Sequence, residues 1–379
     1  MDLHVLKQKL IAAAISAPEP AHKELNDLRQ YSNLIMQLPA GDRKILSQAL
    51  HPILFLPNQN NFSPDLVKRI KKDLLWLLRV QQEATYIIKT FNLLGIHPLI
   101  LKGGALLERY PHRFKNRRMA DLDLLIPISA RKHVIHSLKQ LGWVPINNLG
   151  EYFLDWTHAW AMKTPLGIGV DIHWHLMPEA MSPLVTDFIF SRSTLVNTGV
   201  YSFQKIDPTC LFFHLCVHGV RKQSGSGLQW IADVLIVLQE EQELEWACLD
   251  SLAKLSHLNL LLSTSLKILQ NYTDRIPKTI IKALSTHSVS IYEKLEYKKA
   301  QTIGIRMRDK NPFAVIWEYA EWYYIWTGRF RSKGIRVNPI RFLKYYTAAE
   351  SLVQGGRNGY ELYTRWHFGR KQIRIIKKK

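Results

Sequence analysis

Hydrophobic positions recur at helical spacing over the first 94 residues, most clearly between Ser63 and Gly95. Ser63 followed by Pro64 is a typical helix start, and Gly95 is a typical helix stop. The pattern therefore predicts a helical N-terminal region over residues 1–94, with a long helix at its end.

Between residues 95 and 205 the pattern changes to short apolar runs that alternate with helical segments. The runs "HPLIL" and "MADLDLLIP" predict two strands, and "SARKHVIHSLKQLG" predicts a helix after them. Further strands are expected in "WVPIN", "EYFLDWTHAWAM" and "GIGVDIHWHL". Alternating helices and strands are typical of an α/β core.

Helical spacing returns at Pro208, in the segments "PTCLFFHLCVHGVRK", "LQWIADVLIVLQEE" and "WACLDSLAKLSHLNLLLSTSLKILQNY". These segments predict a helical domain over residues 206–300, followed by a basic, aromatic-rich helical region over residues 301–379. The expected fold class is therefore α+β, with a core containing a small mixed sheet between two helical regions.

The composition is that of a folded globular protein, with 47% hydrophobic residues. Its three cysteines show no paired zinc spacing and make a disulfide framework improbable, so a reducing cytoplasm fits best. No uncharged run approaches the roughly 20 residues that a membrane-spanning helix needs. These features predict a cytoplasmic protein.

The formal charge of +20 favours anionic partners, such as nucleotides, nucleic acid or acidic lipid surfaces. Thirteen lysines and arginines lie beyond Phe330, where there are two glutamates. The segment "FAVIWEYAEWYYIWTGRFRSKGIR", which leads into this region, combines aromatic residues with cations, which suits nucleic acid or the surface of an anionic membrane. An aromatic packing face followed by a solvated basic tail is the alternative interpretation.

Three aspartates on two predicted strands suggest a metal site. Because side chains alternate along a strand, Asp121 and Asp123 point the same way, and Asp171 shares its face with His173 and His175. Carboxylates held close together repel each other, whereas hard divalent ions prefer carboxylate oxygens as ligands. His173 and His175 either orient Asp171 or contact substrate, or are ordinary packing residues.

A glycine turn precedes the aspartates. Gly103 and Gly104 follow the predicted strand "PLILK" and open a helix, so that backbone N–H groups can approach a phosphate closely. Lys102 adds a cation at the same turn. The sequence therefore offers a polyphosphate site and a metal site in consecutive elements.

The segments "LKGGALLERYPHRFKNRRMADLDLLIP" and "GVDIHWHL" resemble the DNA polymerase β-like nucleotidyltransferases, and most closely a poorly characterised bacterial branch with Lys-Gly-x-Ala and Asp-x-Asp motifs. The wider resemblance covers about residues 75 to 260. It implies transfer of a nucleoside monophosphate from a nucleoside triphosphate, by default ATP, to an oxygen nucleophile, with release of pyrophosphate. The acceptor is left open among a small molecule, a peptide, a protein and RNA.

The resemblance also implies roles for individual residues. Asp121 and Asp123 would bind the nucleotide's Mg²⁺ or Mn²⁺ ions, and Asp171 would bind the catalytic metal and help to activate the acceptor. Gly103 and Gly104 would contact the triphosphate.

Several other polar residues have two interpretations each. Arg118, and less strongly Arg117, either contact phosphate or form a solvated basic turn. Cys210, His214 and His218 recur every four residues, which is compatible with a metal site, although their apolar helix favours packing.

A single acidic residue lies in the apolar helix "LQWIADVLIVL". Because an unpaired buried charge is costly, Asp233 must either have a structural partner or reach the site.

Two other classes of function remain open at this level. The first is a catalytically inactive protein with the same fold that binds nucleic acid through its basic C-terminal region. The second is a peripheral membrane protein that is attached through the same region.

Overall fold

A computed structural model describes residues 2–16, 28–55, 62–146, 154–155, 157–222, 227–302, 320–321, 323–325 and 327. Two compact units divide the chain, residues 1–146 with 158–289 and residues 147–157 with 290–379. The first unit contains the sheet and all the candidate site residues. The basic tail beyond Phe330 lies outside the described residues, so its predicted roles stay predictions.

The N-terminal region is helical, as the hydrophobic pattern predicts. Its α-helices are α1 (Leu3–Ile15), α3 (Ser32–Gln37), α4 (Leu46–Leu50) and α5 (Pro64–Leu93), with short 3₁₀ helices η1 (Asp42–Ile45) and η2 (His51–Phe55) between them. Ser63 and Pro64 open α5, and the turn after this helix contains Gly95 at φ +74°. The predicted start and stop of the long helix are thus confirmed.

In the described part of the chain, seven strands form one mixed sheet in the order β3-β4-β5-β2-β1-β7-β6. They are β1 (Leu99–Ile100), β2 (Asp121–Leu125), β3 (Val144–Pro145), β4 (Ala159–Lys163), β5 (Gly169–His173), β6 (Thr194–Asn197) and β7 (Ser202–Lys205). The β2/β5 and β1/β7 pairs are parallel, and the other pairs are antiparallel. The predicted α+β class with a mixed sheet is confirmed.

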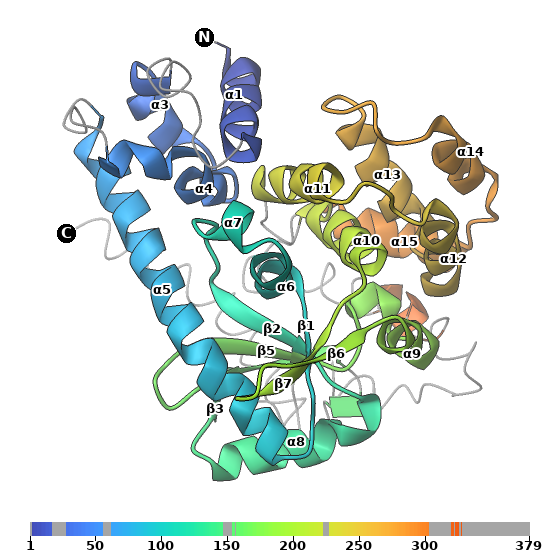
Figure 1. Cartoon of the computed structure of the whole chain (residues 1–379). Helices are drawn as coiled ribbons and strands as arrows, with labels where there is room; N and C mark the ends of the chain where they lie inside the picture. Colours follow the sequence, from blue (N-terminus) through green and yellow to red (C-terminus); the bar gives the residue numbers. More distant parts are fainter. Residues whose placement is uncertain are drawn as a thin grey trace, which may run out of the picture. The chain divides into compact units, whose positions relative to one another are not determined.

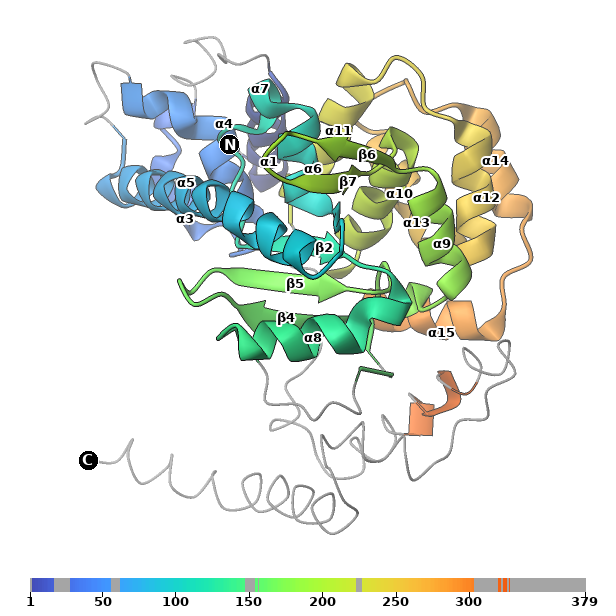
Figure 2. The same cartoon turned by 60° about the horizontal axis from the view of Figure 1, so that its bottom comes forward.

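Helices pack around this sheet. The connecting helices are α6 (Lys102–Arg109), α7 (Pro111–Phe114), η4 (Ile128–Ala130), α8 (Arg131–Gln140), η6 (Pro178–Ala180) and α9 (Pro183–Ser191). In both views β2 and β5 lie between α6 and α8 (Figures 1 and 2). The long helix α5 contacts β2 and β7, and its Trp76 donates a hydrogen bond to the carbonyl of Ala120, which directly precedes Asp121.

The following region is helical, with α10 (Pro208–Gly219), α11 (Gln229–Glu240), α12 (Trp246–Ser256), α13 (Asn259–Leu269) and α14 (Lys278–Thr286). Helix α15 (Ile291–Ala300) belongs to the second unit. None of the described helices is both long enough and apolar enough to cross a membrane. The domain boundaries given above stay predictions.

Two features were not predicted from the hydrophobic pattern. The β6/β7 hairpin extends the sheet beyond β1, and Gly199 in its turn has φ +79°. The segment that begins at Trp246 forms two helices, because His257 adopts a left-handed φ of +56° and ends α12. Histidine is not a typical helix-ending residue, so the sequence carried no strong signal for this break.

Candidate functional site

Asp123 and Asp171 lie directly opposite each other on neighbouring parallel strands. Strand β2 pairs with β5 in a register that places Asp121 beside Gly169 and Asp123 beside Asp171. Leu122 and Leu124 alternate with the aspartates and are buried in the core. The alternation of each strand and the pairing register together bring the carboxylates to one face of the sheet.

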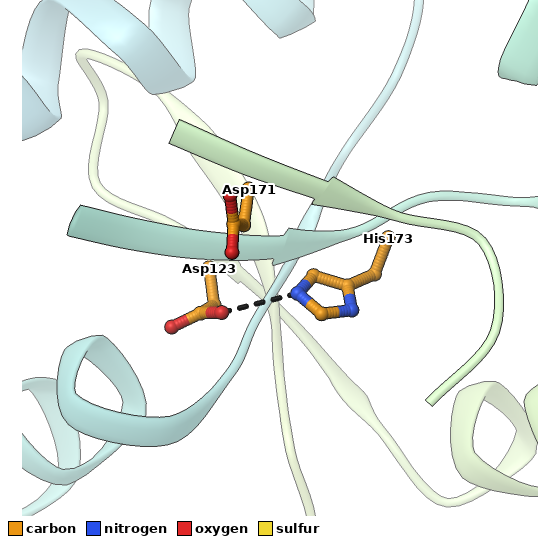
Figure 3. Close-up of side chains that lie close together, drawn as sticks. All are labelled: Asp123, Asp171 and His173. Carbon is orange, nitrogen blue, oxygen red and sulfur yellow. Dashed lines mark hydrogen bonds and ion pairs between the residues drawn. The ribbon is translucent and has the colours of Figure 1, made fainter. Parts of the chain in front are cut away.

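His173 joins these two carboxylates. Its Nε2 atom lies 3.0 Å from Asp123 Oδ1, and one ligand atom each from Asp123, Asp171 and His173 lie within 4.8 Å of one another. Figure 3 shows the three side chains reaching toward one another from β2 and β5. The predicted trio contained Asp121 instead of His173. Asp121 is on the same strand face, but it is not in this closest group.

Lys102 places a positive charge next to Asp123. Its Nζ atom lies 2.5 Å from Asp123 Oδ1, and its side chain is 18% exposed. The backbone of Lys102 has φ +47°, a left-handed conformation that side chains disfavour and that tends to occur at functional sites. The strained strand-to-helix turn thus directs this lysine to a buried carboxylate.

The electrostatic surroundings of the aspartates differ. Burial alone would raise the pKa of Asp123, but Lys102 and His173 outweigh it and hold that pKa below its ordinary value. Burial, followed by the charges of Asp123 and Asp171, raises the pKa of Asp121 to about 7. Burial and Asp123 also raise the pKa of Asp171.

This combination fits a divalent cation. Three acidic groups are placed where their negative charges oppose one another. Lys102 acts on all three carboxylates, but only at Asp123 do Lys102 and His173 together outweigh the effect of burial on the pKa. Carboxylate oxygens and an imidazole nitrogen are suitable ligands for Mg²⁺ or Mn²⁺, with imidazole favouring the transition metal.

Sequence reasoning missed Lys44 at this site. Lys44 belongs to η1 in the N-terminal region, yet its half-buried side chain lies within the electrostatic influence of Asp121, Arg118, Arg117 and Lys102. Burial and then Arg118 lower the pKa of Lys44, while Asp121 raises it. A lysine far away in the sequence thus adds positive charge beside the aspartates, and no local motif announces it.

The two glycines of the turn allow close packing. A Cβ atom on Gly104 would lie 2.7 Å from a methyl carbon of Ile100 and 2.9 Å from one of Leu122. A Cβ atom on Gly103 would lie 2.9 Å from the sulfur of Met119 and would also overlap the Arg117 guanidinium. Close packing therefore requires glycine at both positions, in addition to their predicted role as phosphate contacts.

The arginines before β2 are fixed by carboxylates. Arg117 donates two hydrogen bonds to Asp233, from Nε at 2.8 Å and from an Nη atom at 2.7 Å. Asp233 is 1% exposed, and Arg117 is the partner that balances its buried charge. This pairing agrees with the structural interpretation of Asp233. Arg118 Nε lies 3.0 Å from Asp73 of α5, which holds Arg118 close to the start of β2.

The two remaining candidate histidines lie outside the closest cluster. His175 follows β5 and is 8% exposed. His218 lies on α10, where its ring packs edge-on against that of His214 and burial lowers its pKa. Cys210 interacts with Cys248, and within the described residues Asp123, Asp171 and His173 make up the one candidate metal group.

Comparison with known proteins gives the family. The model of a family described as "Uncharacterised nucleotidyltransferase" matches residues 48–274, which is more than half of the chain. The chain belongs to this uncharacterised nucleotidyltransferase family. The matched residues include the glycine turn, β2, β5 and the helices α10 and α11, so the family assignment covers all of the site except Lys44.

Chains in solved structures match this protein, one of them at a low level of identity. It is an antigenic nucleotidyltransferase-like protein from Paracoccidioides brasiliensis, with 15% identity and a TM-score of 0.34. The match covers 58% of this chain and 95% of that one. A search of curated proteins found no match.

Proposed function

We propose that this member of the uncharacterised nucleotidyltransferase family transfers a nucleoside monophosphate from a nucleoside triphosphate to an oxygen nucleophile. The observation that carries the proposal is the placement of Asp123 and Asp171 opposite each other on parallel strands, beside His173 and Lys102. Paired carboxylates beside a cationic turn are what metal-assisted phosphoryl transfer requires.

A divalent metal, Mg²⁺ or Mn²⁺, would be held by Asp123 and Asp171, with Asp121 and His173 as further ligands. When bound, the metal neutralises phosphate charge and polarises the reacting phosphoryl group. The raised pKa of Asp121 and Asp171 fits this proposal, because burial and the neighbouring carboxylates outweigh the nearby protein cations at both groups, and a divalent ion would supply further positive charge.

The chain's own cations would bind the triphosphate. Lys102 and Lys44 place positive charge beside the aspartates, and the backbone at Gly103 and Gly104 opens helix α6 toward the same region. Arg118 lies next to them and completes the predicted set of phosphate contacts. Electrostatic stabilisation and positioning of this kind supply most of the catalysis in phosphoryl transfer.

Asp171 would accept the proton of the acceptor hydroxyl. Its carboxylate is half-buried and lies opposite Asp123 in the strand register, so an acceptor hydroxyl placed at the proposed metal site would lie beside it. The acceptor oxygen forms a bond to the α-phosphorus, the bond between that phosphorus and the bridging oxygen breaks, and pyrophosphate leaves with the bond's electrons. ATP is the default donor.

The test is transfer of label from each α-³²P nucleoside triphosphate, with Mg²⁺ or Mn²⁺, to fractions of a cell lysate. Wild type should label one fraction, and Asp123→Asn and Asp171→Asn should lower labelling at least 100-fold while each variant still unfolds in a single cooperative transition in EDTA at a temperature above that of the assay. Asp187→Asn is the matched control, because Asp187 is an exposed aspartate on α9. Equal labelling by all four proteins would refute the proposal.

A further inference from the structure

A large cleft lies along α5 next to the start of β2. It has a volume of about 1310 Å³, and its lining includes residues of α5 together with Arg118 and Ala120. Ala120 directly precedes Asp121, so one side of the cleft is formed by the segment that leads into the aspartate strand. Pockets for small molecules usually enclose roughly 300–1,000 Å³, which this cleft exceeds.

The cleft lining is strongly basic. Its cations are Lys68, Lys71, Lys72, Arg79 and Arg118. Among the described residues that line the cleft, Asp73 is the one carboxylate, and it already pairs with Arg69 and Arg118. The exposed lysines therefore give the cleft a positive electrostatic potential that no further carboxylate of its lining offsets.

The cations form a row along one face of a helix. Lys68, Lys72 and Arg79 follow one another at intervals of four and seven residues, which places them on the same side of α5. At 1.5 Å per residue the row spans about 16 Å. Successive phosphates of a stacked strand are about 3.4 Å apart along its axis, so the row can accompany several of them.

An aromatic side chain lies within this row. Trp76 lines the cleft, its indole N–H donates to the carbonyl of Ala120 at 3.2 Å, and the guanidinium of Arg79 lies 5.7 Å from the centre of its ring. The indole is thus tied to the residue before Asp121. Aromatic rings between cations are the typical surface for bases and phosphates of a single strand.

We propose that this cleft binds single-stranded RNA and presents a terminal hydroxyl of the strand to the site at Asp121. The inference rests on the proposed function, because it names the acceptor for the same site. The cationic row and the neighbouring Lys71 bind the phosphates, and Trp76 stacks on a base. An anionic membrane would satisfy the charge as well, but these residues line a cleft that can enclose a strand, and we therefore favour the strand.

The experiment measures binding of a 5′-fluorescein ten-nucleotide RNA by fluorescence anisotropy without nucleotide or metal, so that catalysis plays no part. Lys68→Gln/Lys71→Gln should weaken binding at least tenfold and reduce the salt dependence of log K by about 1.4, since each phosphate contact on a single strand contributes about 0.7. Lys89→Gln/Lys267→Gln is the control. Both lysines are exposed and lie outside the cleft, and their substitution removes the same amount of positive charge. Trp76→Leu should weaken binding about tenfold.

Equal loss of binding in the cleft and control variants would overturn the proposal, because it would show a general charge effect. Equally tight binding of a duplex would also overturn it, since a duplex offers no free base to Trp76. Flotation with anionic vesicles that depends on Lys68 and Lys71, in the absence of RNA binding, would assign the cleft to a membrane instead.

The acceptor role needs a second readout. With α-labelled triphosphate, wild type should add label to the same RNA, and Lys68→Gln/Lys71→Gln should raise the RNA concentration for half-maximal rate at least tenfold. Binding at the cleft with label transferred to another acceptor would overturn the acceptor role. Binding at the cleft with no transfer to any acceptor would refute the proposed function and leave the binding site in place.

Discussion

Lys102 Nζ and Asp123 Oδ1 form a 2.5 Å ion pair between the glycine turn and the aspartate strand. The lysine balances the charge of a carboxylate that is 6% exposed, from a backbone conformation that is itself strained. The same carboxylate is a proposed metal ligand. The pair therefore places a protein cation beside a proposed metal ligand.

Replacing this lysine should make the protein depend on metal for stability. Lys102→Met should lower the free energy of unfolding in EDTA by about 3 kcal/mol, because it leaves a buried carboxylate without its cation. Saturating Mn²⁺ should stabilise the variant more than it stabilises wild type. Urea unfolding with and without Mn²⁺ measures both effects, with Lys89→Met as an exposed control; equal stabilisation of Lys102→Met and wild type would count against the metal site.

The raised pKa of Asp121 predicts a pH effect without metal. Folded Asp121 keeps its proton up to a pKa of about 7, whereas the unfolded chain loses it near pH 4. Between these values the folded state binds more protons, so raising the pH from 5 to 8 should lower stability. Urea unfolding in EDTA should show a smaller loss over this range for Asp121→Asn. An identical pH profile in both proteins would show that Asp121 titrates normally.

Gly104 should be intolerant of a side chain because of its packing. Gly104→Ala places a Cβ atom 2.7 Å from Ile100 and should cost about 1–3 kcal/mol of stability, as overpacking usually does. Gly169→Ala is the matched control, since its Cβ atom would meet Asp121 Cβ at 3.5 Å, an ordinary contact. Chemical denaturation compares the two. Equal stability of both variants would show that α6 does not pack this closely on the sheet.

The buried pair of Arg117 and Asp233 should behave as a unit. Arg117→Met should destabilise the protein by about 3–5 kcal/mol, because it leaves Asp233 buried at 1% exposure without a partner. The double variant Arg117→Met/Asp233→Leu should recover most of that loss. A double-mutant cycle from urea unfolding gives the coupling energy. Additive effects would show that the two side chains do not depend on each other.

Part of this structure follows directly from the sequence. The alternation in "MADLDLLIP" and "GIGVDIHWHL" put Asp121 and Asp123, and separately Asp171 and His173, on common strand faces. The register that sets Asp123 opposite Asp171 depends on how the two strands pair, so alternation alone did not give it. The place of His173 in the closest cluster follows from that register.

Other features depend on contacts between distant segments. Lys44 approaches the site from a helix that precedes β2 by more than 70 residues, and no local pattern marks it. The ion pair of Lys102 requires a left-handed backbone that lysine rarely adopts. The β6/β7 hairpin had a usable signal, since alternating residues flank a turn that contains Gly199, but the segment is short and was not predicted as strands.

Mn²⁺ binding, followed by electron paramagnetic resonance of the free ion, tests the central claim most directly. In the presence of a non-hydrolysable nucleoside triphosphate, wild type and the surface control Asp187→Asn should bind Mn²⁺ equally. Asp123→Asn and Asp171→Asn should each bind it at least tenfold more weakly. Equal affinity in all four proteins would contradict the assignment of these two aspartates as the metal centre.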